Sequence, residues 1–251
     1  MADPPSIVID FYYDCLSPFS YFAFVALRRY MEVWKSARIE LKPFVLAGVN
    51  AKTGNVAPFA RPWAQSTMKE QLQHLRRNVE FFNVPGMLPM PANFFGPDGP
   101  ADRRGLARDL RYQRLLVAVR RLHPERLWEV TGLVFDHIWA SREARDKAGN
   151  VAMSEAVLED LCLRAGLPAE AARRCVEAIT AEETKRALAE SVEEAVHRGG
   201  YGAPTIVVAG VAGREEMVFF GSDRFEQLAF CSGLPWYGPD PSRPTRLEAK
   251  L

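Results

Sequence analysis

Residues 7–30 read IVIDFYYDCLSPFSYFAFVALRRY, and this stretch decides the fold. Its first seven residues, 7–13, are β-branched and aromatic and predict a strand. Ser17 followed by proline is typical of a helix start, because serine caps helices and proline is favoured at the first helical position. Apolar residues that recur every three or four positions predict a helix over 18–35. Alternation over 39–44 predicts a second strand, which completes a strand–helix–strand unit.

The middle of the chain, from about residue 64 to 196, carries almost only helical patterning. Within it the stretch 84–105 is rich in proline and glycine and predicts a loop. The expected helices span 68–82, 106–122, 124–140, a short segment capped by Ser154, 168–179 and 182–197.

Strand character returns at 205–209 and 216–220, with a turn between them, and 223–231 is expected to be helical. The two ends of the chain must then pair into one sheet. We therefore expect an α/β fold with a large all-helical insertion between the second strand and the strand after Pro204. The expected domains are a discontinuous sheet domain (5–60 and 185–235), a helical insertion (61–184) and a tail (236–251).

Composition narrows the classes of function. The 251 residues are 48% apolar and 25% charged, and the formal net charge of +1 does not favour nucleic acid as a partner. No apolar run of about 18 residues is present, so no membrane insertion is expected. The four cysteines form no C-x-x-C pair and the four histidines are scattered. We therefore expect free thiols and no metal site.

The first candidate site is Cys-Leu-Ser-Pro-Phe-Ser at 15–20. A helix N-terminus favours an anion, and in redox proteins it lowers the pKa of the first cysteine of C-x-x-C. Here Ser17 and Ser20 stand at the two positions, and Cys15 comes two residues too early to replace the first. A disulfide oxidoreductase is therefore the least favoured class. A serine can donate a hydrogen bond to the thiolate of a bound ligand, or it can be a plain helix cap.

Two further features follow near the C-terminus. In Gly199–Ile206, GGYGAPTI, a proline after glycines and before an apolar strand is a candidate cis peptide, with an ordinary turn as the alternative. The sequence 221–224, GSDR, lies between the last strand and the last helix. Its amides, hydroxyl and carboxylate suit an α-amino acid group, and a surface Asp–Arg pair is the alternative.

Together, in this order, the three features resemble the kappa-class glutathione transferase and 2-hydroxychromene-2-carboxylate isomerase family, which belongs to the thioredoxin-like disulfide oxidoreductase superfamily. The resemblance extends from about residue 7 to 238. The matching segments are FYYDCLSPFSYFAF at 11–24, LAGVNAKTGN at 46–55, YGAPTI at 201–206 and FGSDR at 220–224.

The resemblance implies a thioredoxin-like fold and glutathione as co-substrate. Ser17 would contact the glutathione sulfur and favour the thiolate. Asn55 would help hold the glutathione or the serine loop. The remaining implied roles are Ala203 for main-chain pairing with the cysteinyl unit, Pro204 as the cis residue beside it, Ser222 and Asp223 for the γ-glutamyl end, and Arg224 for reaching the neighbouring subunit of a homodimer.

The implied function is a kappa-type glutathione transferase that conjugates hydrophobic electrophiles, which serves detoxification. The alternatives are a glutathione-dependent isomerase of the 2-hydroxychromene-2-carboxylate type and a glutathione-binding protein with little activity. The last is motivated by Ala64, which stands where the family usually has a lysine. The electrophile pocket is expected near Phe59, Trp63 or Phe94.

The final tripeptide, Ala249-Lys250-Leu251, has the shape and charge of the S-K-L peroxisomal address. It predicts recognition by the peroxisomal import receptor and a peroxisomal location. The cytosol and the mitochondrion are the alternatives.

Overall fold

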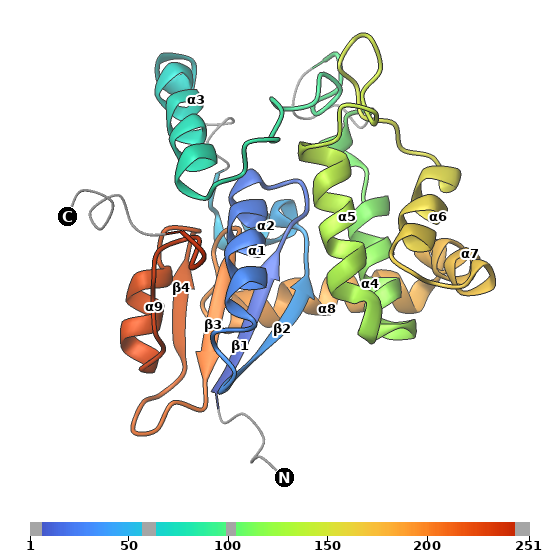
Figure 1. Ribbon diagram of the computed structural model, residues 1–251. Coiled ribbons are helices and arrows are strands. Elements are labelled where there is room, and N and C mark those ends of the chain that lie inside the picture. Colours follow the sequence, from blue (N-terminus) through green and yellow to red (C-terminus); the bar gives the residue numbers. More distant parts are fainter. Residues whose placement is uncertain (1–6, 57–63, 99–103, 244–251) are drawn as a thin grey trace.

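The computed structural model describes residues 7–56, 64–98 and 104–243. A four-stranded mixed sheet in the order β2-β1-β3-β4 forms its centre (Figure 1). β1 (Ile7–Tyr13) runs parallel to β2 (Ala37–Pro43) and antiparallel to β3 (Thr205–Ala209), which pairs antiparallel with β4 (Met217–Phe220). The ends of β1, β2 and β4 and the start of β3 therefore share one edge of the sheet, called the site edge below.

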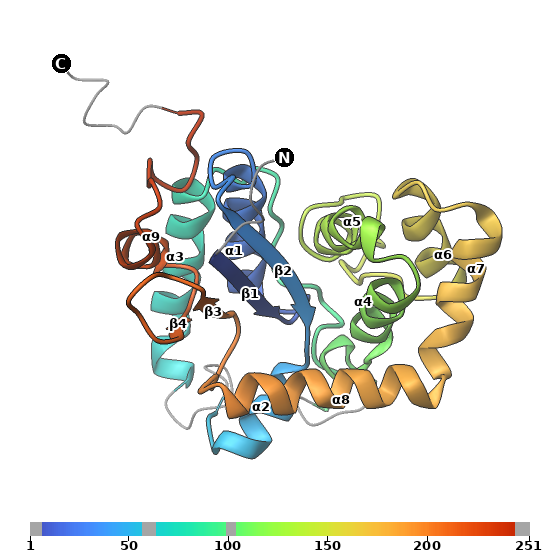
Figure 2. The same cartoon turned by 90° about the horizontal axis from the view of Figure 1, so that it is seen from below.

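Helices cover both faces of the sheet (Figure 2). α1 (Pro18–Tyr30) and α9 (Phe225–Ser232) pack on the face that carries Phe11 and Ile206. α2 (Leu46–Thr53) and α8 (Glu182–His197) pack on the other face, where Tyr12 and Val207 meet Val192. This division follows from the alternation of side chains along a strand. It confirms the α/β arrangement with strands contributed by both ends of the chain.

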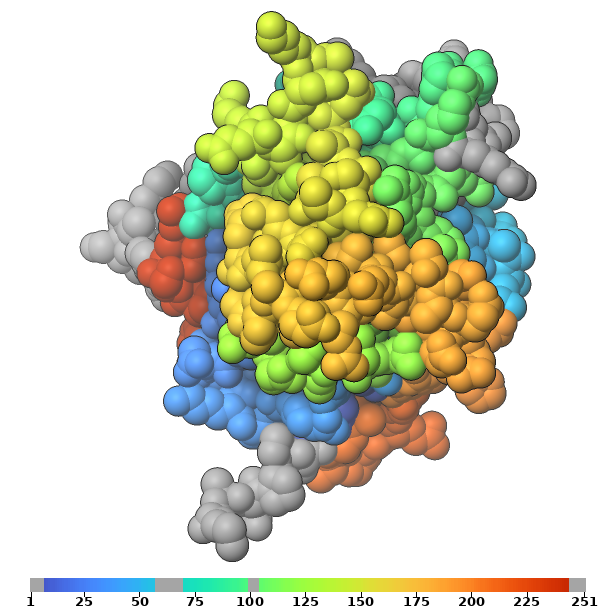
Figure 3. All heavy atoms as spheres, turned by 90° about the vertical axis from the view of Figure 1, so that its right-hand side faces the viewer, coloured from blue at the N-terminus to red at the C-terminus, as the bar shows by residue number. Residues whose placement is uncertain are grey.

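The inserted helices lie on two sides of α1 (Figures 1 and 2). α3 lies on the α9 side, and the others form a lobe on the opposite side, whose outer surface is seen in Figure 3. The bounds are α3 (Ala64–Phe81), α4 (Arg111–Leu122), α5 (Leu127–Trp139), α6 (Glu155–Arg164) and α7 (Ala169–Glu177), with 3₁₀ turns at Leu106–Arg108, Pro124–Arg126 and Ala178–Thr180. The expected helical insertion is confirmed, while the domain limits remain a prediction.

Several local expectations were wrong. α3 begins at Ala64, four residues earlier than expected, and β2 spans Ala37–Pro43 rather than 39–44. α1 ends at Tyr30, five residues early, because the carbonyl of Tyr30 accepts the amides of Val33 and Trp34 in a turn that leads into β2. α2 was not predicted at all. α4 begins at Arg111, because the carboxylate of Asp109 accepts the Arg111 amide (3.0 Å) and separates it from the preceding 3₁₀ turn.

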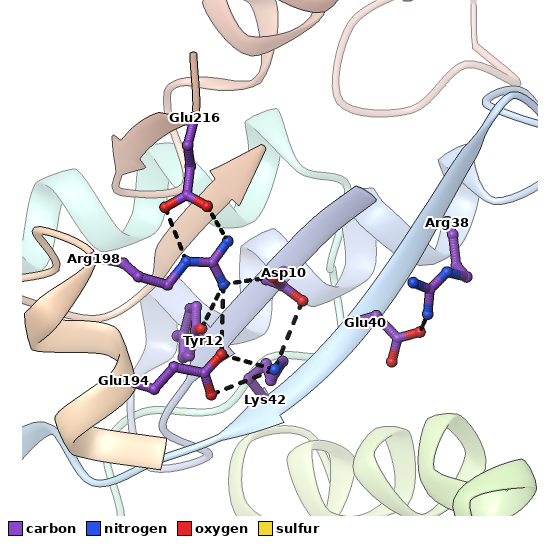
Figure 4. A network of polar contacts seen from close by, with 8 residues as sticks. All are labelled: Asp10, Tyr12, Arg38, Glu40, Lys42, Glu194, Arg198 and Glu216. Atoms are coloured by element: carbon purple, nitrogen blue, oxygen red, sulfur yellow. Dashed lines mark hydrogen bonds and ion pairs between the residues drawn. The ribbon is translucent and has the colours of Figure 1, made fainter. Parts of the chain in front are cut away.

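A network of charged side chains joins α8 to the sheet (Figure 4). Arg198 donates to Asp10 (2.6 Å), to the Tyr12 hydroxyl (2.8 Å) and to Glu216 (2.6 and 2.9 Å). Lys42 donates to Glu194 (3.0 Å) in the same cluster. Arg198 directly follows α8 and precedes the 199–204 loop. The network therefore holds the start of that loop, between α8 and β3, in a fixed position against the sheet.

Candidate active site

Ser17 caps α1 at the site edge. Its backbone is extended, with φ −93° and ψ 118°, and its Oγ accepts the amide hydrogen of Ser20 at 3.2 Å. Among the described residues no acceptor takes the hydroxyl proton of Ser17. A hydroxyl has one donor and two acceptor positions, so the capping bond leaves the proton available to a ligand. The helix N-terminus favours an anion as that ligand.

Asp14 holds the elements around Ser17 together. Its carboxylate accepts the amide hydrogens of Leu16 (3.0 Å) and Leu46 (2.8 Å) and the side-chain amide of Gln113 (2.8 Å). Its carbonyl accepts the amide of Ser17 at 2.9 Å. Burial raises the pKa of the Asp14 carboxyl, and these hydrogen bonds oppose the rise. The sequence analysis did not identify Asp14 as a site residue. The one signal in the sequence is its position as a carboxylate directly after an apolar strand.

The cis peptide bond predicted before Pro204 is present, between Ala203 and Pro204. Tyr12 pairs with Thr205 in the antiparallel β1–β3 ladder. The same register, continued by one residue, sets Pro204 opposite Tyr13, so the cis bond lies beside the start of the Ser17 loop. No described residue pairs with the amide or carbonyl of Ala203. This main chain is therefore available for pairing with an extended ligand.

Asn55 holds the proline loop rather than the Ser17 loop. Its Nδ2 donates to the carbonyl of Tyr201 at 2.7 Å, and its Oδ1 accepts the amide of Val56 at 2.9 Å. Both ends of the side-chain amide are therefore engaged within the protein. The geometry favours a positioning role for Asn55.

The 221–224 segment is joined to the proline loop, because the Gly221 amide donates to the carbonyl of Pro204 at 3.0 Å. Gly221 has φ +101°, and a Cβ there would lie 2.6 Å from Oδ1 of Asp223. Ser222 is buried, whereas Asp223 and Arg224 are exposed and form an ion pair of 3.4 Å. α9 begins at Phe225, two residues later than expected.

Cys15 is buried, and burial raises the pKa of its thiol. Its carbonyl accepts the indole hydrogen of Trp139 at 2.9 Å. A neutral, enclosed thiol is poorly suited to act as a nucleophile. All four cysteines are free, as predicted.

The expected electrophile pocket is only partly described. Phe59 and Trp63 lie outside the described residues. Phe94 is nearly buried and packs against Trp139, so it offers little open wall. A hollow of about 300 Å³ lies elsewhere, between α1 and α5, and the hydrogen bond from Tyr21 to Asp136 (2.7 Å) spans it. It is lined along α1 from Tyr21 onward, away from Ser17.

No group of His, Cys, Asp or Glu side chains in the described ranges could hold a metal ion. None of the helices in those ranges is long and apolar enough to cross a membrane.

Comparison with known proteins identifies the family to which this chain belongs. A family model described as a DSBA-like thioredoxin domain matches residues 8–230. "Glutathione S-transferase kappa 1" of Rattus norvegicus is 33% identical over 99% of both chains. The protein of that name from Homo sapiens is 30% identical over 93% of this chain and 94% of its own. The chain belongs to the DsbA-like thioredoxin family. Within it, the chain groups with the kappa-class glutathione transferases.

Solved structures share the fold of this chain. A 2-hydroxychromene-2-carboxylate isomerase structure has a TM-score of 0.66 at 19% identity, covering 90% of this chain and 94% of its own. The cytosolic disulfide reductase DsbM from Pseudomonas aeruginosa has a TM-score of 0.55 at 18% identity, covering 90% and 97%. In this chain Ser17, Ala203, Pro204 and Ser222 lie at the site edge.

Proposed function

We propose that this protein is a kappa-type glutathione transferase in which Ser17 activates the glutathione thiol. The observation that carries the proposal is the Ser17 hydroxyl, which caps α1 while its own proton has no acceptor among the described residues. The cis Ala203–Pro204 bond beside it offers unpaired main chain for the cysteinyl unit. Both full-length relatives quoted above carry the name of this activity, which supports the same proposal.

The energetics of thiol activation are sufficient without a general base. A thiol of pKa about 8.5 needs roughly 2.7 kcal/mol of preferential thiolate stabilisation to ionise about two pH units lower. A hydrogen bond to a charged group contributes about 1.5–3 kcal/mol. The helix terminus adds about 0.3–1 kcal/mol. The thiolate then bonds to an electrophilic carbon of a hydrophobic partner, and the leaving group departs with its electron pair.

The γ-glutamyl group would lie at Ser222 and Asp223, where a buried hydroxyl and an exposed carboxylate stand together. The second candidate function is a glutathione-dependent isomerase, favoured by the likeness to the isomerase structure. In that reaction the thiolate adds to an unsaturated substrate and leaves again. Isomer turnover with catalytic rather than stoichiometric glutathione would favour the isomerase over the transferase.

Calorimetric titration with glutathione tests the proposal. We expect binding at neutral pH with release of a proton, seen as a dependence of the heat on the ionisation enthalpy of the buffer. S-methylglutathione is the matched control, because it keeps the peptide groups and has no proton to release. No heat and no thermal shift with glutathione at millimolar concentration would exclude the transferase and the isomerase together. If glutathione binds but no electrophile is turned over, the protein is a glutathione-binding protein and not a transferase.

We also propose a homodimer that places Arg224 near the partner's site. The edge strand β4 exposes Val218 and Phe220, and Phe220 packs its ring against the exposed Tyr201 at 4.7 Å. An apolar sheet edge of this kind usually needs a partner. Light scattering should give twice the 28.2 kDa chain mass, and a monomer at micromolar concentration would contradict the proposal.

We propose peroxisomal import through Ala249-Lys250-Leu251, which lies outside the described residues. The chain before it is fixed to the body, because Tyr30 donates to the carbonyl of Gly238 (2.7 Å) and Asn83 donates to Asp240 (2.9 Å). A fluorescent fusion with a free C-terminus should enter peroxisomes, and the same fusion extended beyond Leu251 should not. An identical distribution of the two would contradict the proposal.

A further inference from the structure

The loop between α8 and β3, residues 199–204, has little in its own sequence to fix its path. Three of its six residues are glycine, and Gly199 has φ +87°, in the left-handed region. Glycine leaves the backbone many accessible conformations. The path of the loop, and with it the place of the Ala203 main chain, therefore depends on the contacts that anchor the loop.

Contacts from neighbouring elements hold the middle and the end of this loop. Asn55 donates to the carbonyl of Tyr201 (2.7 Å), and the amide of Gly221 donates to the carbonyl of Pro204 (3.0 Å). Ala203 lies between these two anchored carbonyls, and no described residue pairs with its own amide or carbonyl. A ligand that pairs with Ala203 thus meets a main chain that is placed by its neighbours.

The start of the loop is anchored by Arg198. Its guanidinium lies between Asp10 on β1 and Glu216 directly before β4 (Figure 4). Nη1 donates to Asp10 (2.6 Å), while Nε and Nη2 donate to the two oxygens of Glu216 (2.9 and 2.6 Å). β3 lies between β1 and β4 in the sheet, so this one side chain joins the two strands that flank β3.

These contacts close a ring that contains Ala203. The ring runs from Arg198 to Glu216, along β4 to Gly221, through the hydrogen bond to Pro204, and back along the loop. β4 has four residues and lies at the edge of the sheet, where β3 is its one neighbouring strand. The position of β4 relative to the start of the loop is therefore set by Arg198. Loss of Arg198 would open the ring and leave the path of the loop less fixed.

The charges around Arg198 make this contact hard to replace. Arg198 faces three carboxylates, those of Asp10, Glu194 (3.6 Å) and Glu216. The second cation of the network, Lys42, lies 3.0 Å from Glu194 and 3.9 Å from Asp10. Removal of Arg198 would leave three carboxylates around one ammonium group, and their repulsion would move Glu216 and β4 away from β1. A lysine is a compact charge that cannot bind Glu216 through two N–H groups and also reach Asp10.

We propose that Arg198 is a positioning residue for glutathione, which holds the Ala203 main chain where it can pair with the cysteinyl unit. The inference rests on the proposed transferase function. In this pairing the cysteinyl amide donates to the carbonyl of Ala203. Arg198 acts through the loop and through β4, because its own guanidinium is occupied by Asp10, Tyr12 and Glu216.

Glutathione and an analogue that carries a methyl group on the cysteinyl amide nitrogen test this inference. The methyl group removes the hydrogen that the carbonyl of Ala203 would accept. The measured quantity is the dissociation constant of the analogue divided by that of glutathione, both from calorimetry. In the wild type the loss of one hydrogen bond should raise this ratio by about three- to tenfold. Any effect of the methyl group on the free peptide is common to all variants and cancels when their ratios are compared.

In Arg198→Met the carbonyl of Ala203 is no longer held in place for either ligand. Glutathione should therefore bind about three- to tenfold more weakly, and the ratio should fall by about the same factor. Arg198→Lys keeps the charge beside Asp10 and should recover much of the stability to urea that Arg198→Met loses, but not the wild-type ratio. If Arg198→Met does not fold, Arg198→Lys carries the test.

Arg29→Met is the matched control. Arg29 is also partly buried, it donates to the carbonyls of Phe82 (2.6 Å) and Asn83 (3.0 Å), and it lies near the end of α1 that is remote from Ser17. This variant should lose stability to urea without a change in the ratio. A ratio that falls in the Arg198 variants alone therefore reports the loop and not a general loss of stability.

The outcomes separate the positioning role from the transferase itself. If the wild type binds glutathione and a folded Arg198 variant shows the wild-type ratio, Arg198 does not position Ala203 and the transferase stands. An equal fall of the ratio in Arg29→Met would overturn the positioning role in the same way. If the wild type binds neither glutathione nor the analogue, the transferase and the positioning role fail together.

Discussion

Ser17→Ala is expected to lower kcat/KM for glutathione conjugation by about 10- to 100-fold, the equivalent of one charge-assisted hydrogen bond. The variant removes the hydroxyl whose proton has no acceptor among the described residues. The apparent pKa of enzyme-bound glutathione should rise by about one to two pH units for the same reason. The measurement is the thiolate absorbance of the bound glutathione as a function of pH.

A second capping serine provides the control. Ser154 caps α6, and its side chain accepts the amide hydrogen of Val157 at 3.3 Å, much as Ser17 accepts that of Ser20. Both alanine variants should lose about 1 kcal/mol of stability through the lost cap. Only Ser17→Ala should change the thiolate titration. Equal titration curves for wild type and Ser17→Ala would show that this serine is a helix cap alone.

Ser20 offers a further contrast in the same turn. Its hydroxyl is fully buried and has no hydrogen-bond partner in the described part of the chain. Ser20→Ala should therefore leave conjugation unchanged and cost little stability, because no hydrogen bond is lost. This pair of variants distinguishes the roles of the two serines at the start of α1.

The local sequence pattern was enough to predict the bounds of an element wherever short-range signals define them. β1 and β3 begin and end where predicted, because runs of β-branched and aromatic residues are bounded by polar residues, glycine or proline. The cis bond at Pro204 followed from the same kind of signal, a proline between glycines and an apolar strand. Ser17 was placed correctly at the start of α1 by the serine–proline pair.

Elements that depend on distant contacts were not predictable in this way. α1 ends at Tyr30 although apolar residues continue, and the indole N–H of Trp34 donates to the carbonyl of Pro235, 201 positions away (2.7 Å). α2 buries only Val49, so its pattern is weak, and its first amide is held by Asp14. His74 lies near Phe19 only because α3 folds against α1. No local signal encodes these pairings.

Asp14→Ala is expected to destabilise the protein by about 3–5 kcal/mol, because it leaves two buried donors and one partly buried donor without an acceptor. The donors come from the Ser17 loop, from the first residue of α2 and from Gln113 on α4. Glutathione affinity should fall as well, since these elements support the site edge. Urea unfolding followed by circular dichroism measures the stability. If the alanine variant does not fold, Asp14→Asn keeps the shape and shows the same direction of effect.

Asp146 is the matched control, because its carboxylate accepts the same types of donor at the surface. The donors are the amides of Ala148 and Asn150 and the side-chain amide of Asn150, at 2.8–2.9 Å. Asp146→Ala should change stability far less than Asp14→Ala. Equal losses in the two variants would show that burial of Asp14 does not matter.

The two carboxylates should also respond to pH with opposite signs. Burial raises the pKa of Asp14, so the native state holds its proton more tightly than the unfolded chain does. Its stabilising contribution is then complete below about pH 4 and declines as the pH rises through the native pKa. The amides of Asn150 lower the pKa of Asp146, whose contribution is present above about pH 4 and disappears on acidification. The stability lost in Asp14→Ala should therefore shrink from acid to neutral pH, while that lost in Asp146→Ala grows. Parallel pH profiles would contradict the assignment of Asp14 as the buried carboxylate that joins α1, α2 and α4.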